Sequence, residues 1–413
     1  MQETINLENL YQKIDSYKDE SIKMQEDFVA IPALSSVNGG DGEFKKSLKI
    51  KEYMDKIGYD TFSEMNAPDD RVPSGIRPNH IYRMKGKNSS RTIWIMSHID
   101  VVPPGEARLW NTDPYKIKVD GDFIYGRGTE DNHQGMISSI LAFKALKEMS
   151  VKPEYDVALL FVSDEETHSD YGIKYILKQN KNIFTKDDII IIPDAGKPDS
   201  CLIEVAEKSI LWMKFTVTGK QTHASRPNAG VNAFKAGSIL VMKLYELNKI
   251  FSKTDPVFSP PTSTFEPTKK EPNVPNANTI PGEDIFYYDC RVLPDYNLDD
   301  ILKKVDEICR EIEKAENVKI SFETPSKEVA APVTAPDADV VKRLAKSIKA
   351  VTGRDAKPMG VGGGTVAAYI RKYNYPAVVW TTKDEVAHQA NEYCKISYML
   401  TDAKIFLNLY VMK

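Results

Sequence analysis

Short apolar segments that alternate with helical patterns are the feature that most limits how this chain can fold. Val157–Val162 and Ile189–Ile192 contain no charged residue, and each lies beside a segment with helical periodicity. Strands of this kind are typical of a mostly parallel sheet that helices cover on both faces. We therefore predict an α/β domain. Because a membrane helix needs ~20 apolar residues, we also expect no membrane partner.

The pattern changes between residues 208 and 322. Every second residue from Leu211 to Val217 is apolar, which is the period of a half-exposed strand. The prolines between residues 255 and 281 exclude a central strand there and favour a long loop. We expect strands at 285–292 and 318–322 and helices at 232–248 and 298–315. Their order predicts a small α+β domain in which both helices cover one face of the sheet.

The α/β character resumes after Phe322, with a helix expected at 338–351 and a strand at 377–380. The simplest architecture is one discontinuous domain, formed by residues 1–207 and 323–413. A smaller domain of residues 208–322 interrupts it.

Composition and charge exclude several classes of protein. With 41% hydrophobic and 28% charged residues among 413, the chain has the composition of a globular protein. The net charge of −4, with both signs interspersed, gives no reason to expect a nucleic-acid partner. The polar N-terminus lacks the features of a secretory signal, so we expect a cytoplasmic protein. The four cysteines have no CxxC spacing and fit reduced thiols.

Histidines and acidic residues follow three of the predicted strands. His98 and Asp100 come after the strand at 92–96, Glu165 and Glu166 after Val157–Val162, and Asp194 after the strand ending near residue 193. The carboxyl ends of parallel strands meet at one edge, where ligands bind in open α/β sheets. Each group also has an alternative explanation, as a loop histidine beside a turn aspartate or as an acidic surface turn.

Two more residues complete a candidate metal site. Asp131 lies in a glycine-rich segment before a helix, where an N-cap is the alternative explanation, and His388 follows the strand at 377–380. Together the five candidates offer two imidazoles and three carboxylates, the mixed ligands that bind zinc and related ions. Of the adjacent carboxylates Glu165 and Glu166, one could bind metal and the other could take a proton from water.

The chain resembles the zinc amidohydrolase family of acetylornithine deacetylase, succinyl-diaminopimelate desuccinylase, aminoacylase and carboxypeptidase G. The resemblance covers nearly the whole chain. It is carried by SHID at 97–100, YGRGTEDNHQG at 125–135, SDEET at 163–167, PDAG at 193–196, GKQTHASRPNAGVNAF at 219–234, NTIPG at 278–282, DCRVLPD at 289–295 and AHQANEY at 387–393.

The resemblance implies a role for each residue of the site. Asp131 would bridge two divalent ions, most simply zinc, with cobalt or manganese as alternatives. His98 and Asp194 would complete one set of ligands, and Glu166 and His388 the other. Glu165 would be the general base for a metal-activated water, and Asp100 would orient His98.

The resemblance also implies substrate contacts in the inserted domain and beyond it. His223 would stabilise the oxyanion, while Asn278, Arg291, Gly364 and Thr365 would hold the carboxylate and carbonyl of a small-molecule substrate. The insert would act as a lid and as the surface of a homodimer.

Two segments depart from the family pattern. Many relatives have Lys-Gly soon after the bridging aspartate, where this chain has Asn-His-Gln-Gly at 132–135. We interpret His133 as a surface residue at a helix start. The glycine-rich turn at 362–364 lacks an acidic or serine residue after its Gly-Thr, which bears on substrate choice. His80 and His168 match no role.

We predict hydrolysis of the amide bond of an N-acyl amino acid. A dipeptidase or carboxypeptidase uses the same metal site, so the sequence leaves that alternative open. A third hypothesis is a non-catalytic homologue that acts as a binding protein. Against it stands the presence of every expected ligand and of the base.

Overall fold

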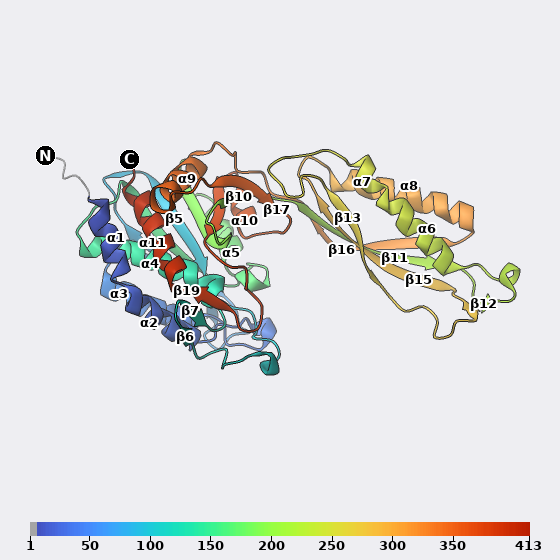
Figure 1. The fold of residues 1–413 in the computed structure, drawn as a ribbon, viewed down its shortest axis with the longest axis horizontal. Helices are drawn as coiled ribbons and strands as arrows, with labels where there is room; N and C mark the ends of the chain where they lie inside the picture. The colour runs from blue at the N-terminus through green and yellow to red at the C-terminus, as the bar shows by residue number, and fades with distance from the viewer. Residues whose placement is uncertain (1–5) are drawn as a thin grey trace. The chain divides into compact units, whose positions relative to one another are not determined.

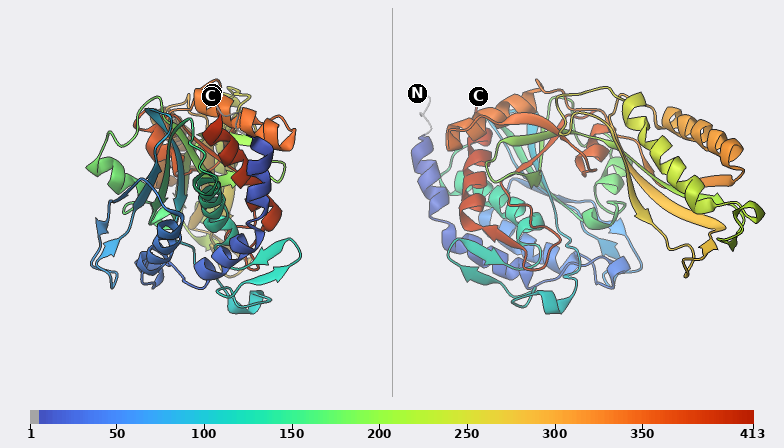
Figure 2. Two further views of the ribbon diagram at one scale, coloured as in Figure 1. Left: turned by 90° about the vertical axis from the view of Figure 1, so that its left-hand side faces the viewer. Right: turned by 45° about the vertical axis from the view of Figure 1, so that its right-hand side comes forward.

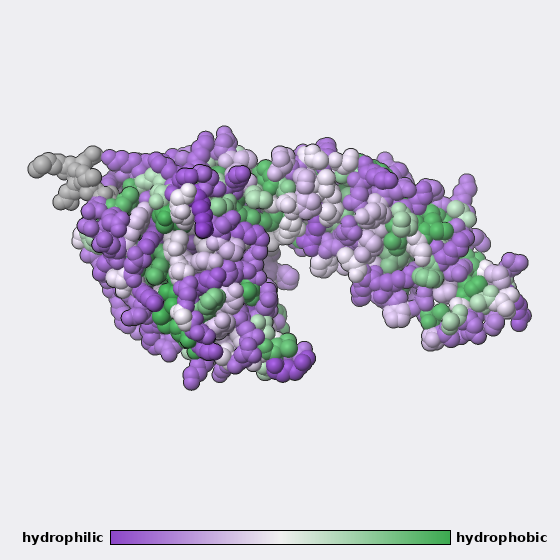
Figure 3. All heavy atoms as spheres, in the orientation of Figure 1, coloured by the Kyte–Doolittle hydropathy of each residue, from purple (hydrophilic) through white to green (hydrophobic). Residues whose placement is uncertain are grey.

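A computed structural model describes residues 6–413, which form two compact units. The first unit comprises residues up to Val205 together with Thr334–Pro358 and Tyr369–Lys413, and the second comprises Ala206–Val333 and Met359–Ala368. The predicted boundary after residue 322 falls inside strand β16 (Lys319–Glu328), because that strand continues pairing along β11 (Ser209–Thr218) as far as Glu328. Polar residues cover most of the visible face of each unit (Figure 3).

A large sheet of eight strands organises the first unit (Figure 1). Its strands, in spatial order, are β1 (Thr61–Glu64), β4 (His80–Met84), β8 (Tyr155–Val162), β5 (Asn88–His98), β9 (Ile189–Gly196), β18 (Ala377–Thr381), β10 (Leu202–Glu207) and β17 (Lys357–Val361). The four central strands β8, β5, β9 and β18 run parallel, while β4 and β10 are antiparallel to their inner neighbours. The predicted α/β fold with a covered, largely parallel sheet is confirmed.

Helices pack on both sides of this sheet (Figure 2). They are α1 (Leu7–Asp15), α2 (Lys18–Val29), α3 (Phe44–Ile57), α4 (Gly135–Glu148), α5 (Ile173–Gln179), α9 (Asp339–Thr352) and α11 (Ile396–Val411). The helices α1 and α2 are separated at Ser16, whose hydroxyl donates to the Lys13 carbonyl oxygen and competes with the helical hydrogen bonds. No helix among residues 6–413 is long and apolar enough to cross a membrane.

Smaller elements complete the two units. They are β2 (Ala67–Pro68), β3 (Ile76–Arg77), β6 (Lys118–Asp120), β7 (Phe123–Tyr125), β12 (Thr222–His223), α7 (Leu247–Ile250), β14 (Thr279–Ile280), α10 (Ala367–Arg371) and β19 (Tyr393–Lys395).

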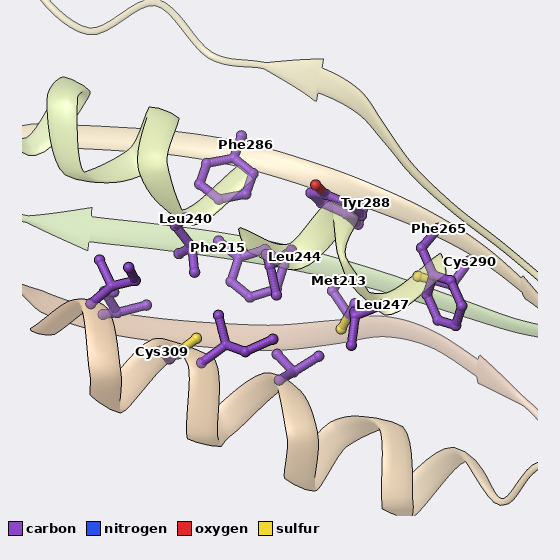
Figure 4. Packing of buried hydrophobic residues seen from close by; sticks show 14 of the residues in the cluster. Met213, Phe215, Leu240, Leu244, Leu247, Phe265, Phe286, Tyr288, Cys290 and Cys309 are labelled. Atoms are coloured by element: carbon purple, nitrogen blue, oxygen red, sulfur yellow. The ribbon is translucent and has the colours of Figure 1, made fainter. Parts of the chain in front are cut away.

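The second unit contains a four-stranded antiparallel sheet in the order β13 (Thr264–Lys270), β15 (Glu283–Val292), β11, β16. The apolar residues of β11 point to one face, as their alternation predicted. There they form one core with α6 (Ala233–Tyr245) and α8 (Leu298–Glu316), so both helices cover the same face (Figure 4).

The proline-rich segment is only partly a loop. Its residues 264–270 form the edge strand β13, which has β15 as its one partner in the sheet. The register shifts between Pro267 and Lys269. An edge strand tolerates proline because one side of it makes no ladder hydrogen bonds. The prediction of a loop throughout this segment was therefore wrong for β13.

Candidate metal centre

The five predicted ligands meet in the first unit, at the carboxyl ends of its parallel strands. The residues come from separate elements: His98 from the end of β5, Asp131 from a π-helical turn (Thr129–Gln134) before α4, Glu166 from a 3-10 turn (Glu165–Thr167) after β8, Asp194 from β9, and His388 from the loop after β18. Asp194 lies within β9 rather than beyond it, because that strand extends to Gly196.

Asp131 stands between two sets of ligand atoms. Its Oδ1 lies 2.9 Å from His98 Nε2, which is itself 3.8 Å from Asp194 Oδ1. Its Oδ2 lies 3.4 Å from His388 Nε2, which is 3.1 Å from Glu166 Oε2. The two oxygens of one carboxylate thus face two different histidines, as they would in a carboxylate that bridges two ions.

The donor atoms fit two divalent cations. In each of the sets His98–Asp131–Asp194 and Asp131–Glu166–His388, one ligand atom per residue lies within 4.8 Å of the others. Each set offers one imidazole and two carboxylates, a mixture that suits zinc and related ions.

Crowding of buried carboxylates shapes the electrostatics of this site. Burial, with Asp194 nearby, raises the pKa of Glu165 well above its usual range, and burial raises the pKa of Glu166 to about 7. Burial alone would also raise the pKa of Asp131, but Lys383 and the two histidines hold it well below the ordinary value. Since two buried glutamates resist ionisation as they stand, cations would stabilise their charged forms.

Asp100 lies where it can orient both sides of the site. Its Oδ1 is 3.5 Å from His98 Nδ1, and its main-chain oxygen is 3.0 Å from the same nitrogen. Its carboxylate also accepts hydrogen bonds from the backbone N–H groups of Glu165 and Glu166, at 3.1 and 3.0 Å. Among residues 6–413, no donor forms a hydrogen bond to the Glu165 carboxylate itself, which leaves this group able to accept a proton.

Three charged residues that support this site were missed in the sequence. The Glu392 carboxylate accepts hydrogen bonds from Arg127 and from the N–H groups of Gly128, Glu130 and Asp131. Glu130 in turn accepts from the N–H groups of residues 384 and 386, in the loop that carries His388.

The third missed residue is Lys383, whose Nζ donates to the Asp194 main-chain oxygen at 2.8 Å. Glu392 belongs to the AHQANEY motif, a signal that could have drawn attention to it. Glu130 likewise belongs to the motif YGRGTEDNHQG at 125–135, next to Asp131. Lys383 lies in none of the quoted motifs, and a lysine is usually solvated.

The prediction that His133 is a surface residue was wrong. Its side chain is fully buried, and its Nε2 lies 2.8 Å from Nζ of Lys46, which is also buried. The π-helical turn directs His133 inward against Phe28, an orientation that an ordinary helix start does not predict. His80 is buried as well, 3.2 Å from the Tyr82 hydroxyl, whereas His168 is exposed.

The predicted substrate contacts lie in the second unit, in two groups. His223 and Asn278 are neighbours, because β12 pairs with β14 and the Ala224 N–H donates to the Asn278 main-chain oxygen. Arg291 on β15 donates to Asp289 through two nitrogens and to the Gly362 main-chain oxygen through the third, at 3.0 Å.

Gly364 and Thr365 follow in the same glycine-rich turn, where the Thr365 hydroxyl donates to Glu207. An added Cβ at Gly364 would meet no atom within 4 Å. Arg291 therefore lies beside a turn with open space around its glycines.

Comparison with known proteins identifies relatives along nearly the whole chain. The model of peptidase family M20/M25/M40 matches residues 94–411. An uncharacterized metallohydrolase of Methanococcus maripaludis is 40% identical, over 95% of this chain and 99% of its own length. The succinyl-diaminopimelate desuccinylase of Nautilia profundicola is 28% identical, over 77% of this chain and 82% of its own.

Solved structures share the fold at low identity. Aminopeptidase PepT of Bacillus cereus superposes with a TM-score of 0.73 at 18% identity, covering 95% of this chain and 98% of its own. A Bacillus subtilis protein described as a dinuclear metal binding peptidase from the M20 family superposes with a TM-score of 0.65 at 15% identity, covering 96% and 98%.

Proposed function

The chain belongs to peptidase family M20/M25/M40 and is a metallohydrolase, and from this premise we propose that it cleaves the amide bond of an N-acyl amino acid. The observation that carries the proposal is the placement of Asp131 between two mixed sets of ligand atoms, with the Glu165 carboxylate beside them. Two ions bound there, which we propose to be zinc, would polarise the amide carbonyl and activate water.

The roles of the protein's own groups follow from their positions. Glu165 takes a proton from the attacking water and later delivers it to the departing amine. Burial raises the pKa of this carboxyl, which makes its ionised form a stronger base than an exposed glutamate and its protonated form able to return the proton. Asp100 holds the main chain of Glu165 and the ring of His98 in fixed relation while the proton moves.

We further propose that the substrate carries a free carboxylate. Arg291, with Asn278, Gly364 and Thr365, would hold this end of the substrate, and His223 would stabilise the oxyanion. The second unit would form the surface of a homodimer, and we expect the reaction to take place in the cytoplasm. A deacylase is favoured by the name of the Nautilia relative. The alternative is a dipeptidase or carboxypeptidase.

The test begins with metal content and substrate range. Protein loaded with zinc is expected to bind about two ions per chain and to release amine from acetylornithine, succinyl-diaminopimelate or a member of a dipeptide panel. A protein that binds two ions and hydrolyses no amide in any of these would overturn the proposal.

A variant separates the base from the ligands. Glu165→Gln is expected to keep both ions and to lose at least about a hundredfold in kcat, because the amide cannot accept the proton. Glu52→Gln, an isosteric change on the exposed face of α3, should leave both metal content and kcat unchanged. Full activity in Glu165→Gln would refute its role as base.

A further inference from the structure

Lys383 is a buried cation beside the candidate metal centre. Its side chain lies in the loop after β18, the residue is 6% exposed, and its Nζ donates to the main-chain oxygen of Asp194. Its one ion pair among residues 6–413 is with Glu130 Oε2 at 4.0 Å, which is beyond hydrogen-bond distance. The ammonium group therefore has no carboxylate in direct contact, and its charge acts on the surrounding site.

The loop that carries Lys383 is fixed on both sides. The N–H and hydroxyl of the preceding residue, Thr382, donate to the buried carboxylate of Asp402. The N–H groups of Asp384 and Val386 donate to Glu130. With both flanks anchored and its own Nζ bonded, Lys383 cannot move its charge away when a cation enters the site.

A purely structural role is the competing explanation, and the chain provides a comparison for it. Lys208 in the second unit is also buried, at 3% exposed, and its Nζ donates to the main-chain oxygens of Pro260 and Thr262 at 2.9 and 2.6 Å. Lys208 thus shows how a buried lysine serves as a tether between segments. Lys383 differs in its setting, because its Nζ contacts the main chain of the candidate ligand Asp194 and lies 4.0 Å from Glu130 Oε2. Against the lowering effect of burial, Asp131 and Asp194 also raise the pKa of its ammonium group.

We propose that Lys383 is a positioning residue whose fixed positive charge sets unequal affinities for the two metal ions. It offsets part of the negative charge of Asp194 and Asp131, so the ion held by His98, Asp131 and Asp194 binds more weakly than the ion held by Asp131, Glu166 and His388. The two positions therefore fill in order as the metal concentration rises. This inference rests on the proposed dinuclear site.

The charge and the tether predict opposite results for one substitution. In Lys383→Met the repulsion is removed, so the larger of the two zinc dissociation constants is expected to fall about tenfold, as Coulomb's law gives for a divalent ion near a unit charge in a high dielectric. If Lys383 were only a tether, its loss would loosen Asp194 and raise that constant. Zinc titration of the full chain against a chelating indicator measures both constants.

Further variants keep the test decisive. Lys383→Gln, which is neutral but can still donate to a carbonyl, should also bind the second zinc more tightly and replaces the methionine variant if that one does not fold. Lys383→Arg keeps the charge and should leave both constants unchanged. Lys208→Met removes the comparable tether in the second unit and should leave zinc affinity unchanged.

The outcomes distinguish the two proposals. Wild-type protein that binds fewer than two zinc ions contradicts the dinuclear site itself. If the wild type binds two ions, and Lys383→Met and Lys383→Gln both bind the second zinc no more tightly than the wild type, the role of Lys383 is overturned. The dinuclear site then stays intact.

Discussion

The Glu392 carboxylate offers a sharp test of how the metal centre is held together. Its two oxygens divide four donors between them: Oε1 accepts from the N–H groups of Glu130 and Asp131, and Oε2 from Arg127 and the Gly128 N–H. Glu392 is fully buried and Arg127 is 2% exposed. The substitution Glu392→Gln keeps the shape of the side chain but turns one oxygen into a donor.

The size of the effect follows from these contacts. Whichever way the new amide is turned, its NH₂ group faces two donors and loses both hydrogen bonds. Hydrogen bonds to a charged group contribute about 1.5–3 kcal/mol each. Removing one partner of a buried ion pair costs about 3–5 kcal/mol, because the remaining charge is left uncompensated. Since these contributions overlap, we expect a loss of about 3–5 kcal/mol in the free energy of unfolding.

Urea unfolding followed by circular dichroism measures this loss as a shift in midpoint. Zinc affinity should fall in parallel, because Glu392 holds the main chain at Asp131. The matched control is Glu307→Gln, which removes an exposed ion pair with Lys304 on α8 and should leave the midpoint unchanged. A loss below about 1 kcal/mol in Glu392→Gln, where a buried pair is broken, would refute this account.

Two other perturbations have effects that the structure fixes in direction. Burial lowers the pKa of His80 to about 4, so between about pH 6.5 and 4 the unfolded chain binds a proton that the folded chain does not. Stability should fall as pH drops through this window, by at most about 3 kcal/mol, and thermal denaturation of His80→Gln should show a correspondingly smaller fall. A Cβ at Gly196 would lie 1.6 Å from the Thr381 main-chain oxygen. Gly196→Ala should therefore separate β9 from β18 and destabilise the protein by about 3 kcal/mol. Gly362→Ala is the control, because its Cβ would enter open space, and it should leave stability unchanged. Equal melting temperatures for the two glycine variants would contradict the clash.

The meeting of the candidate ligands at one edge of the sheet could be predicted because the signal is local. An apolar strand and the residue that follows it are adjacent in sequence, so the run ending at Val162 already indicates where Glu165 and Glu166 emerge. The same reasoning places His98 at the end of β5.

The charged residues behind the site could not be predicted in this way. Lys46 and His133 are far apart in sequence and belong to residue types that usually face solvent, so their buried contact depends on how α3 packs against the π-helical turn. The edge strand β13 was missed for a related reason. Its pairing with β15 decided this feature, and local propensity did not.

The hydrogen bonds of Glu392 and Glu130 join the segment around Asp131 to the end of the chain. During synthesis on the ribosome, residues 98 to 194 emerge long before residue 388. A nascent or prematurely terminated chain that ends before β18 therefore lacks His388 and the loop that carries it. It also lacks Glu392, the carboxylate that accepts the hydrogen bond of the Asp131 N–H. If the site holds two ions as proposed, the ability to hold both is thus coupled to completion of the polypeptide.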